Sequence, residues 1–171
     1  MELLPFNRCG SVSEYDMQNA LVKVIRNREY WDSNYSQMYH SAFTEVTIPG
    51  IGRRSDIIIK MGGSKLINIE CKLIHYSSVL EQAVDHLRWC DYSYICLHST
   101  AFVPNYIVHK IIKDGVGLIY WTGEAFIEVL HAYYNSYKKG FKDKEIREKV
   151  DRIIQQKSSE QAGNKVKQLE W

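Results

Sequence analysis

Apolar residues recur along this chain at two spacings, one typical of helices and the other typical of strands. Apolar positions three or four residues apart predict helices over residues 11–26, 77–89 and 105–113. Alternating or continuous runs rich in β-branched residues predict strands over residues 43–48, 56–60, 65–74, 92–97 and 116–121. The predicted order of elements is therefore α-β-β-β-α-β-α-β.

The second half of the chain determines the predicted architecture. Its strands are separated by helices, which is typical of α/β proteins in which a mixed central sheet is flanked by helices. Residues 125–134 favour a return strand over a helix, and helical spacing resumes over residues 144–156, after which residues 158–165 are expected to fray. We predict one domain over residues 1–143, followed by a C-terminal helix and basic tail over residues 144–171.

The composition is that of an ordinary globular protein. The chain has 171 residues, 45% of them apolar, which is enough for one sizeable core. It contains no apolar run near the roughly 20 residues that cross a bilayer, and its start does not resemble a secretory signal. The four cysteines form no CxxC pair that would indicate a disulfide framework or a zinc site. We expect a soluble cytoplasmic protein with no membrane partner and no small-molecule cofactor.

Charge is distributed unevenly along the sequence. The net charge is +2, but the segment from Lys138 onward holds ten Lys or Arg and six Asp or Glu, which gives +4 and leaves −2 for the rest. A basic tail of this kind can follow a phosphate backbone. It can equally be the solvated face of a terminal helix, and the two interpretations stay open at this point.

Residues 56–72, DIIIKMGGSKLINIECK, combine a hairpin pattern with three charged residues. Gly62-Gly63 is a turn signal between two strands. Alternate side chains of a strand share a face, so Glu70 and Lys72 lie opposite the apolar face of the second strand. Asp56 begins the first strand about as far from the turn as Glu70, which predicts that the two carboxylates lie at the same end of the hairpin.

Two neighbouring carboxylates and an ammonium group suit metal-dependent hydrolysis of a phosphodiester. Mg²⁺ prefers one or two carboxylates, together with waters and phosphate oxygens. Such an ion lowers the pKa of water, and a nearby lysine can orient the water or stabilise the transition state. The same three residues are also common on solvated strand faces, so the spacing alone leaves both interpretations open.

Asp56, followed fourteen residues later by Glu70-Cys71-Lys72, resembles the PD-(D/E)xK nuclease superfamily. The resemblance covers roughly residues 11–121, including TEVTIPGIGRRSDIII before the hairpin, LEQAVDHLRWCDYSYICL after it, and GVGLIYW as a late core strand. The usual proline before the aspartate is absent. The resemblance implies a restriction-endonuclease-like αβββαβ core.

The resemblance also implies roles for individual residues. Asp56 and Glu70 would be ligands of Mg²⁺, for which Mn²⁺ would substitute, and Lys72 would orient the attacking water or stabilise the transition state. Gln82 would be an accessory residue near the helix start. Its alternative is an exposed helix glutamine.

Glu14 and Glu45 compete for the remaining ligand position. Glu14 matches the helix-one glutamate of resolvase-like members, but Ser11 and Glu14 also form a capping-box pattern at a helix start. Glu45 lies on the strand that precedes Asp56, where its alternative is a solubilising charge on an edge strand. The sequence leaves this choice open.

The expected function is therefore a Mg²⁺-dependent endonuclease that cuts DNA, of restriction, resolvase-like, repair or phage type. The resemblance also implies a homodimer, since one site cuts one strand. Arg53 and Arg54 would clamp phosphates, because guanidinium matches phosphate bidentately, although paired loop arginines are often only solvated. The alternative is an inactive or weakly active nuclease-fold protein that acts in nucleic-acid binding or assembly.

Overall fold

The computed structural model describes residues 12–27, 39–74 and 76–169. Its α-helices are α1 (Glu14–Arg26), α2 (Tyr76–His86), α3 (Asn105–Asp114) and α4 (Lys144–Leu169). Its strands are β1 (Tyr39–Ile48), β2 (Arg53–Met61), β3 (Leu66–Lys72), β4 (Tyr92–His98), β5 (Gly117–Trp121) and β6 (Phe126–Leu130). Short 3₁₀ turns occupy Gly62–Ser64 and Tyr137–Lys139. The predicted order of elements is confirmed, including the return strand β6.

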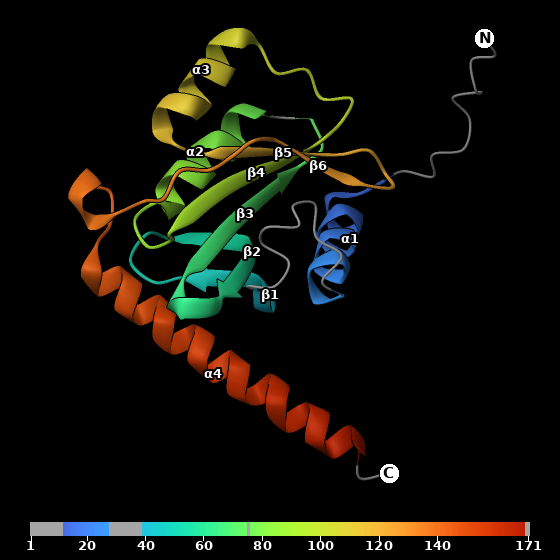
Figure 1. Cartoon of the computed structure of the whole chain (residues 1–171), viewed down its shortest axis with the longest axis vertical. Helices are drawn as coiled ribbons and strands as arrows, with labels where there is room; N and C mark the ends of the chain where they lie inside the picture. The colour runs from blue at the N-terminus through green and yellow to red at the C-terminus, as the bar shows by residue number, and fades with distance from the viewer. Residues whose placement is uncertain (1–11, 28–38, 75, 170–171) are drawn as a thin grey trace, which may run out of the picture.

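The strands form one mixed six-stranded sheet in the order β1-β2-β3-β4-β5-β6. The first two pairs are antiparallel, β3-β4 and β4-β5 are parallel, and β5-β6 is antiparallel again. Figure 1 shows this sheet with helices packed around it. The predicted α/β class, with a mixed sheet flanked by helices, is confirmed.

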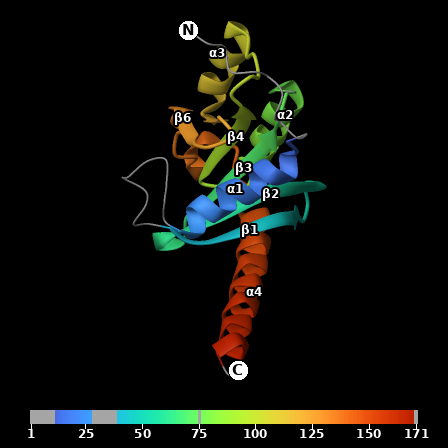
Figure 2. The same cartoon turned by 90° about the vertical axis from the view of Figure 1, so that its right-hand side faces the viewer.

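Each face of the sheet is covered by its own apolar cluster. On one face, α1 buries Met17, Leu21 and Ile25 against the β-branched residues of β2 and β3. On the other face, buried residues of α2 and α3, together with the first turns of α4, pack against Ile58, Ile95 and other strand residues. Figure 2 shows α1 lying across the sheet on the side away from α2 and α3. Because both faces are buried, the alternation of side chains along each strand is fixed.

Helix α4 is longer than the sequence predicts. It runs through residues 158–165, which were expected to fray, and ends only at Leu169. Nothing in this stretch breaks a helix, since it lacks proline and contains a single glycine, and Gln156 donates to Glu160 one turn further on (3.2 Å). The second half of α4 extends away from the sheet in Figures 1 and 2.

The start of α4 belongs to the core of the domain. Ile146, Val150 and Ile154 are buried in the cluster beneath α2. Arg147, which is also buried, donates to the Asp91 carboxylate at 2.8 Å, and Lys142 pairs with the other oxygen of Asp91 at 2.5 Å. The residues around 143–144 are therefore not a packing boundary, although the sequence changes character there.

Asp91 is the centre of this buried ion cluster. Its carboxylate also accepts the backbone N–H of Leu66 at 2.8 Å, which ties the start of β3 to the start of β4. Burial by itself would raise the pKa of Asp91, but the charges of Lys142 and Arg147 and their hydrogen bonds outweigh it and hold the pKa below its ordinary value.

Among the helices that the structure describes, none is long and apolar enough to cross a membrane.

Replacing Asp91 should therefore be costly. We expect Asp91→Ala to lower the free energy of unfolding by about 3–5 kcal/mol, because two buried cations lose their partner. Urea denaturation followed by circular dichroism measures this change. Asp85→Ala, which removes the partly exposed pair with Arg53, is the matched control and should cost no more than about 1 kcal/mol. Equal losses in the two variants would contradict the central role of Asp91.

Candidate functional site

The candidate site begins where β2 and β3 separate. Their ladder runs from Lys60–Leu66 to Ile57–Ile69 and continues no further. The register places Asp56 opposite Glu70, as the hairpin pattern predicts, but β3 continues from there only with β4. The Asp56 carboxylate accepts the backbone N–H of Cys71 at 2.8 Å. A side chain thus satisfies a backbone donor at the point where the two strands diverge.

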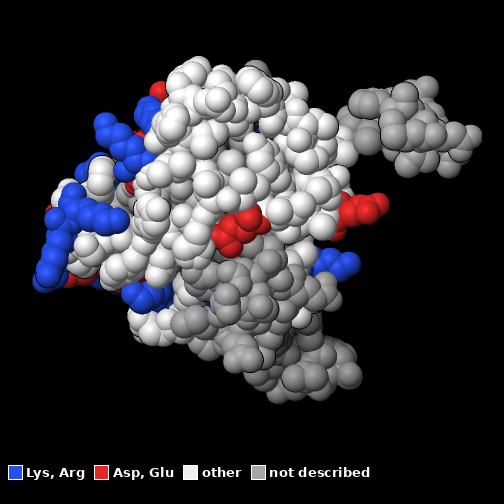
Figure 3. Space-filling view, turned by 45° about the horizontal axis from the view of Figure 1, so that its top comes forward, with Lys and Arg blue, Asp and Glu red and all other residues white. Residues whose placement is uncertain are grey.

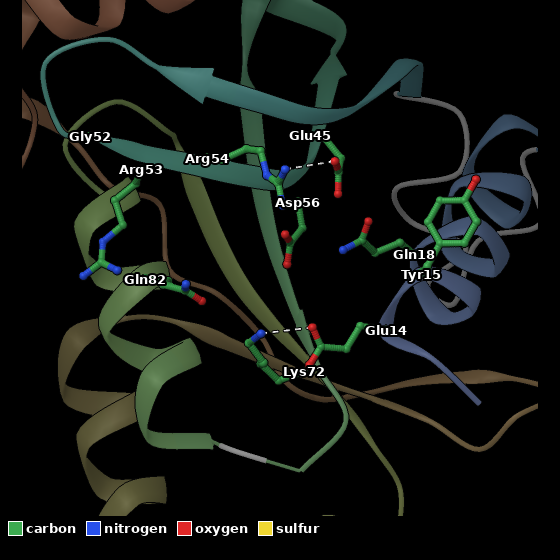
Figure 4. A pocket seen from close by; sticks show the side chains of 10 residues that line it. All are labelled: Glu14, Tyr15, Gln18, Glu45, Gly52, Arg53, Arg54, Asp56, Lys72 and Gln82. Carbon is green, nitrogen blue, oxygen red and sulfur yellow. Dashed lines mark hydrogen bonds and ion pairs between the residues drawn. The ribbon is translucent and has the colours of Figure 1, made fainter. Parts of the chain in front are cut away.

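A pocket of about 420 Å³ opens at this divergence. Five elements contribute to it: α1, β1, β2, β3 and α2, together with the turn before β2. Figure 4 shows the lining residues, which are Glu14, Tyr15, Gln18, Glu45, Gly52, Arg53, Arg54, Asp56, Lys72 and Gln82. All the sequence-predicted site residues except Glu70 are therefore brought together in one pocket.

Glu14 and Lys72 face each other across the pocket. Lys72 Nζ lies 3.0 Å from Glu14 Oε2, and both side chains are partly exposed. The capping-box interpretation of Glu14 is wrong in its pairing: Ser13 is the N-cap and exchanges hydrogen bonds with Asp16, which is its third helical residue. Ser11 lies outside the described residues. Glu14 is thus left free of the cap and turns toward Lys72.

Glu45 and the two arginines are held in ion pairs at the rim. Glu45 Oε2 lies 3.1 Å from Arg54, and Arg53 Nε lies 2.6 Å from Asp85 on α2. Glu45 also has a φ of +54°, which is rare for a residue with a side chain and costs of order 1–3 kcal/mol. In the β1-β2 register, Thr44 pairs with Ile57 and Val46 pairs with Ser55. The strained residue between them therefore lies opposite Asp56.

Glu70 lies beneath the pocket and does not line it. Only 1% of its side chain is exposed, and its Oε1 lies 3.1 Å from Nε2 of His86, which is fully buried on α2. The predicted face of β3 is nevertheless confirmed, because Ile67, Ile69 and Cys71 point to the opposite, α1-covered side. The side chain of Glu70 is shielded from solvent because α2, through His86, packs directly over it.

The carboxylates of the site influence one another. Burial, followed by the negative charge of Glu70, raises the pKa of Asp56 to about 6, against an ordinary value of 3.8. The Cys71 N–H and the Lys72 ammonium oppose this shift, and Glu14 adds to it. The negative charges of Glu70 and Glu14 therefore act on Asp56, and such a group of carboxylates favours the binding of a cation.

Three further residues belong to the surroundings of the site, although the sequence did not single them out. Gln18 lies one turn after Glu14 on α1, is 7% exposed, and points toward Asp56 in Figure 4; Tyr15 lines the outer part of the pocket. His86 follows Gln82 by one turn on α2. The i, i+4 spacing from Glu14 and from Gln82 is the signal that identifies Gln18 and His86, since such residues share a helix face.

The carboxylates of the site are hard oxygen donors, but their side chains are not grouped around one point as the ligands of a single ion would be. In the part of the chain that the structure describes, no three His, Cys, Asp or Glu side chains are arranged as ligands of one ion. Glu14 is engaged by Lys72, Glu45 by Arg54, and Glu70 by His86. Of the three carboxylates that line the pocket, Asp56 is the one for which the described residues provide no ion pair.

Comparison with known proteins gives no functional assignment. No family model matches the chain, and no curated protein does so. A solved structure, the SPO1766 protein of unknown function from Silicibacter pomeroyi, is 17% identical over 78% of this chain and 81% of that chain, with a TM-score of 0.49. A likeness of this size supports neither a fold family nor an activity.

The raised pKa of Asp56 predicts that this site is destabilising at neutral pH. The folded protein holds the proton of Asp56 more tightly than the unfolded chain, so the contribution of Asp56 to stability falls as the pH rises from about 4 to about 6. Asp56→Asn keeps an oxygen for the Cys71 N–H and carries no charge. We expect it to raise the free energy of unfolding by about 1–3 kcal/mol at pH 7.5 and to have little effect at pH 4.

Thermal or urea unfolding of both proteins at the two pH values measures this difference. Asp16→Asn, on the exposed start of α1, is a control because the pKa of Asp16 is lowered by its hydrogen bonds to Ser13. This control should destabilise at pH 7.5. An Asp56→Asn variant less stable than wild type at pH 7.5 would contradict the proposed electrostatics.

Proposed function

We propose that this protein is a Mg²⁺-dependent endonuclease of the restriction-endonuclease-like type that hydrolyses phosphodiester bonds in DNA. The observation that carries the proposal is the convergence of Asp56, Lys72 and Glu14 from three separate elements on one pocket, with Glu70 directly beneath it. Acidic and basic groups that meet in a pocket where two strands part are suited to a cation and a phosphate. The resemblance of Asp56 and Glu70-Cys71-Lys72 to the PD-(D/E)xK pattern points in the same direction.

The chemistry of the donors fits Mg²⁺. This ion is usually held by only one or two carboxylates and takes its other ligands from water and substrate phosphate. Asp56 and Glu70 would hold it, and Glu14 would be the third acidic residue in preference to Glu45. The preference rests on electrostatics, because the charge of Glu14 acts on Asp56, whereas Glu45 is paired with Arg54 at the rim. When bound, the ion would supply an activated water and neutralise charge on the phosphate.

Lys72 is placed to act on the reacting groups. Its ammonium lies within the pocket that Asp56 lines and is held there by Glu14 at 3.0 Å. From this position it can donate to the attacking water or to a phosphate oxygen, and a positive charge fixed near a phosphorane-like transition state lowers its energy. Gln82, which points into the same pocket from α2, is suited to hydrogen bond water or phosphate.

Arg53 and Arg54 would bind the flanking phosphates. Their ion pairs with Asp85 and Glu45 are partly exposed, and pairs of this kind are worth only about 0–1 kcal/mol. A phosphate diester can therefore replace the carboxylates at small cost. Lys and Arg side chains gather mainly on the left of the face in Figure 3, which in Figure 1 is the side of residues 137–139 and the start of α4 and not the side of α1. The proposed phosphate contacts of the site therefore rest on Arg53 and Arg54, which line the pocket. Since one site cuts one strand, cutting both strands would require a homodimer or two binding events.

Cleavage assays with Mg²⁺ test the proposal directly. We expect wild-type protein to cut at least one of a set of linear, nicked, flap and four-way DNA substrates, with RNA as a parallel sample. Asp56→Asn and Lys72→Ala should each reduce the rate by about 10²-fold or more. Lys149→Ala removes a lysine paired with Glu145 on the surface of α4 and should leave the rate unchanged.

The same assay separates the alternatives. Protein that binds these nucleic acids but cuts none of them in Mg²⁺ or Mn²⁺ would favour a nuclease-fold protein that acts through binding or assembly. Cleavage that survives both pocket substitutions would contradict the site assigned above. Each variant needs a circular dichroism spectrum like that of wild type before its rate is compared.

A further inference from the structure

Glu70 and His86 form a polar contact in the interior of the protein. The side chain of Glu70 is 1% exposed and that of His86 is fully buried, and their closest atoms, Oε1 and Nε2, are 3.1 Å apart. Isolating a carboxylate from water costs several kcal/mol unless a partner compensates for it. Among the described residues, His86 is the group that meets this oxygen. The mechanism proposed above makes no use of His86.

Trp89 determines which nitrogen of His86 carries the proton. The indole N–H of Trp89 donates to Nδ1 of His86 at 2.8 Å. The two rings pack edge to face, with 5.5 Å between their centroids. An indole nitrogen is only a donor, so Nδ1 must present its lone pair. The neutral imidazole then carries its proton on Nε2, the atom that faces Glu70. Trp89 is itself held in place, because its carbonyl accepts Arg147 Nη1 at 2.9 Å.

The contact between His86 and Glu70 is short but imperfectly aligned. Both Nε2 and Oε1 are buried and lack a hydrogen bond of good geometry within the described residues, although they lie within hydrogen-bonding distance. The N–H therefore attracts one carboxylate oxygen and favours the orientation of the carboxylate in which that oxygen faces His86. The other buried residues of α2 are Val79, Leu80 and Ala83, which belong to the apolar core, so His86 is the polar residue on the buried face of this helix.

We propose that His86 is a positioning residue, which holds one oxygen of Glu70 and so orients the carboxylate beneath Asp56 for a divalent cation. This inference rests on the proposed function. The two carboxylates are neighbours, because the antiparallel register of β2 and β3 places Asp56 opposite Glu70. Groups that hydrogen bond to metal ligands without touching the metal set ligand orientation, and their loss typically weakens metal binding by about 10–100-fold.

Two amide substitutions separate positioning from simple packing. In His86→Gln, the side-chain amide nitrogen reaches the place of Nε2 and can still donate to Glu70. In His86→Asn, the shorter amide reaches only the place of Nδ1, next to Trp89. Both variants replace the imidazole by a smaller polar group. If His86 only filled space in the core, the two variants would change the Mn²⁺ affinity to a similar extent.

Isothermal titration of each folded protein with Mn²⁺, without nucleic acid, measures the cation affinity. We expect His86→Gln to bind Mn²⁺ nearly as tightly as wild type and His86→Asn to bind at least about tenfold more weakly. Val79→Ala, a buried apolar truncation on the same face of α2, should lower the melting temperature without changing the affinity. Equal affinities in the two amide variants would overturn the inference.

If His86→Asn does not fold, Trp89→Phe tests whether His86 positions Glu70. This change keeps an aromatic ring and removes the N–H that fixes the imidazole, so Nε2 can present a lone pair to Glu70. We expect weaker Mn²⁺ binding, and unchanged affinity would overturn the inference. Wild-type protein that binds no Mn²⁺ would overturn the proposed function as well, whereas tight binding that is unaffected by these variants overturns the role of His86 alone.

Discussion

The candidate site depends on one hydrogen bond, from the backbone N–H of Cys71 to the side chain of Asp56. Beyond Ile57 and Ile69 the antiparallel ladder ends, and β3 continues in partnership with β4 alone. A buried donor without an acceptor would cost a free energy comparable to a lost hydrogen bond. The Asp56 carboxylate provides that acceptor, so the strands can part without leaving this N–H unsatisfied, and a pocket opens between them.

The geometry that opens the pocket also concentrates charge. The helices on the two faces of the sheet approach this point from opposite sides, α1 with Glu14 and α2 with Gln82 and His86. Negative charge accumulates at Asp56 and Glu70, whereas Lys72 is the ammonium group among the residues that line the pocket. An arrangement that is electrostatically unfavourable in the unliganded protein is common where function, and not stability, sets the choice of residues. The buried ion cluster around Asp91, at the opposite end of β3, contributes stability without a pocket.

Side-chain alternation and the position of a glycine turn were sufficient to predict the hairpin, its register and the shared location of Asp56 and Glu70. Local rules did not resolve Glu14, because Ser11 and Ser13 both offer plausible caps. The capping box between Ser13 and Asp16 identifies the cap, and the contact with Lys72 shows where Glu14 is directed. The burial of Glu70 was not predictable, since it depends on how closely α2 packs. The full length of α4 does not follow from its polar composition, which is typical of a frayed end, whereas the helix propensities of its residues favour continuation.

The long α4 also affects how the size of this protein can be measured. A compact chain of 171 residues has a radius of gyration of about 16 Å. Helix α4, with 26 residues, is by itself about 39 Å long, and its second half extends from the body. A particle of this elongated shape diffuses more slowly than a sphere of equal mass. A monomer will therefore elute early from a gel-filtration column, and only a shape-independent mass, from light scattering or sedimentation equilibrium, distinguishes it from a dimer.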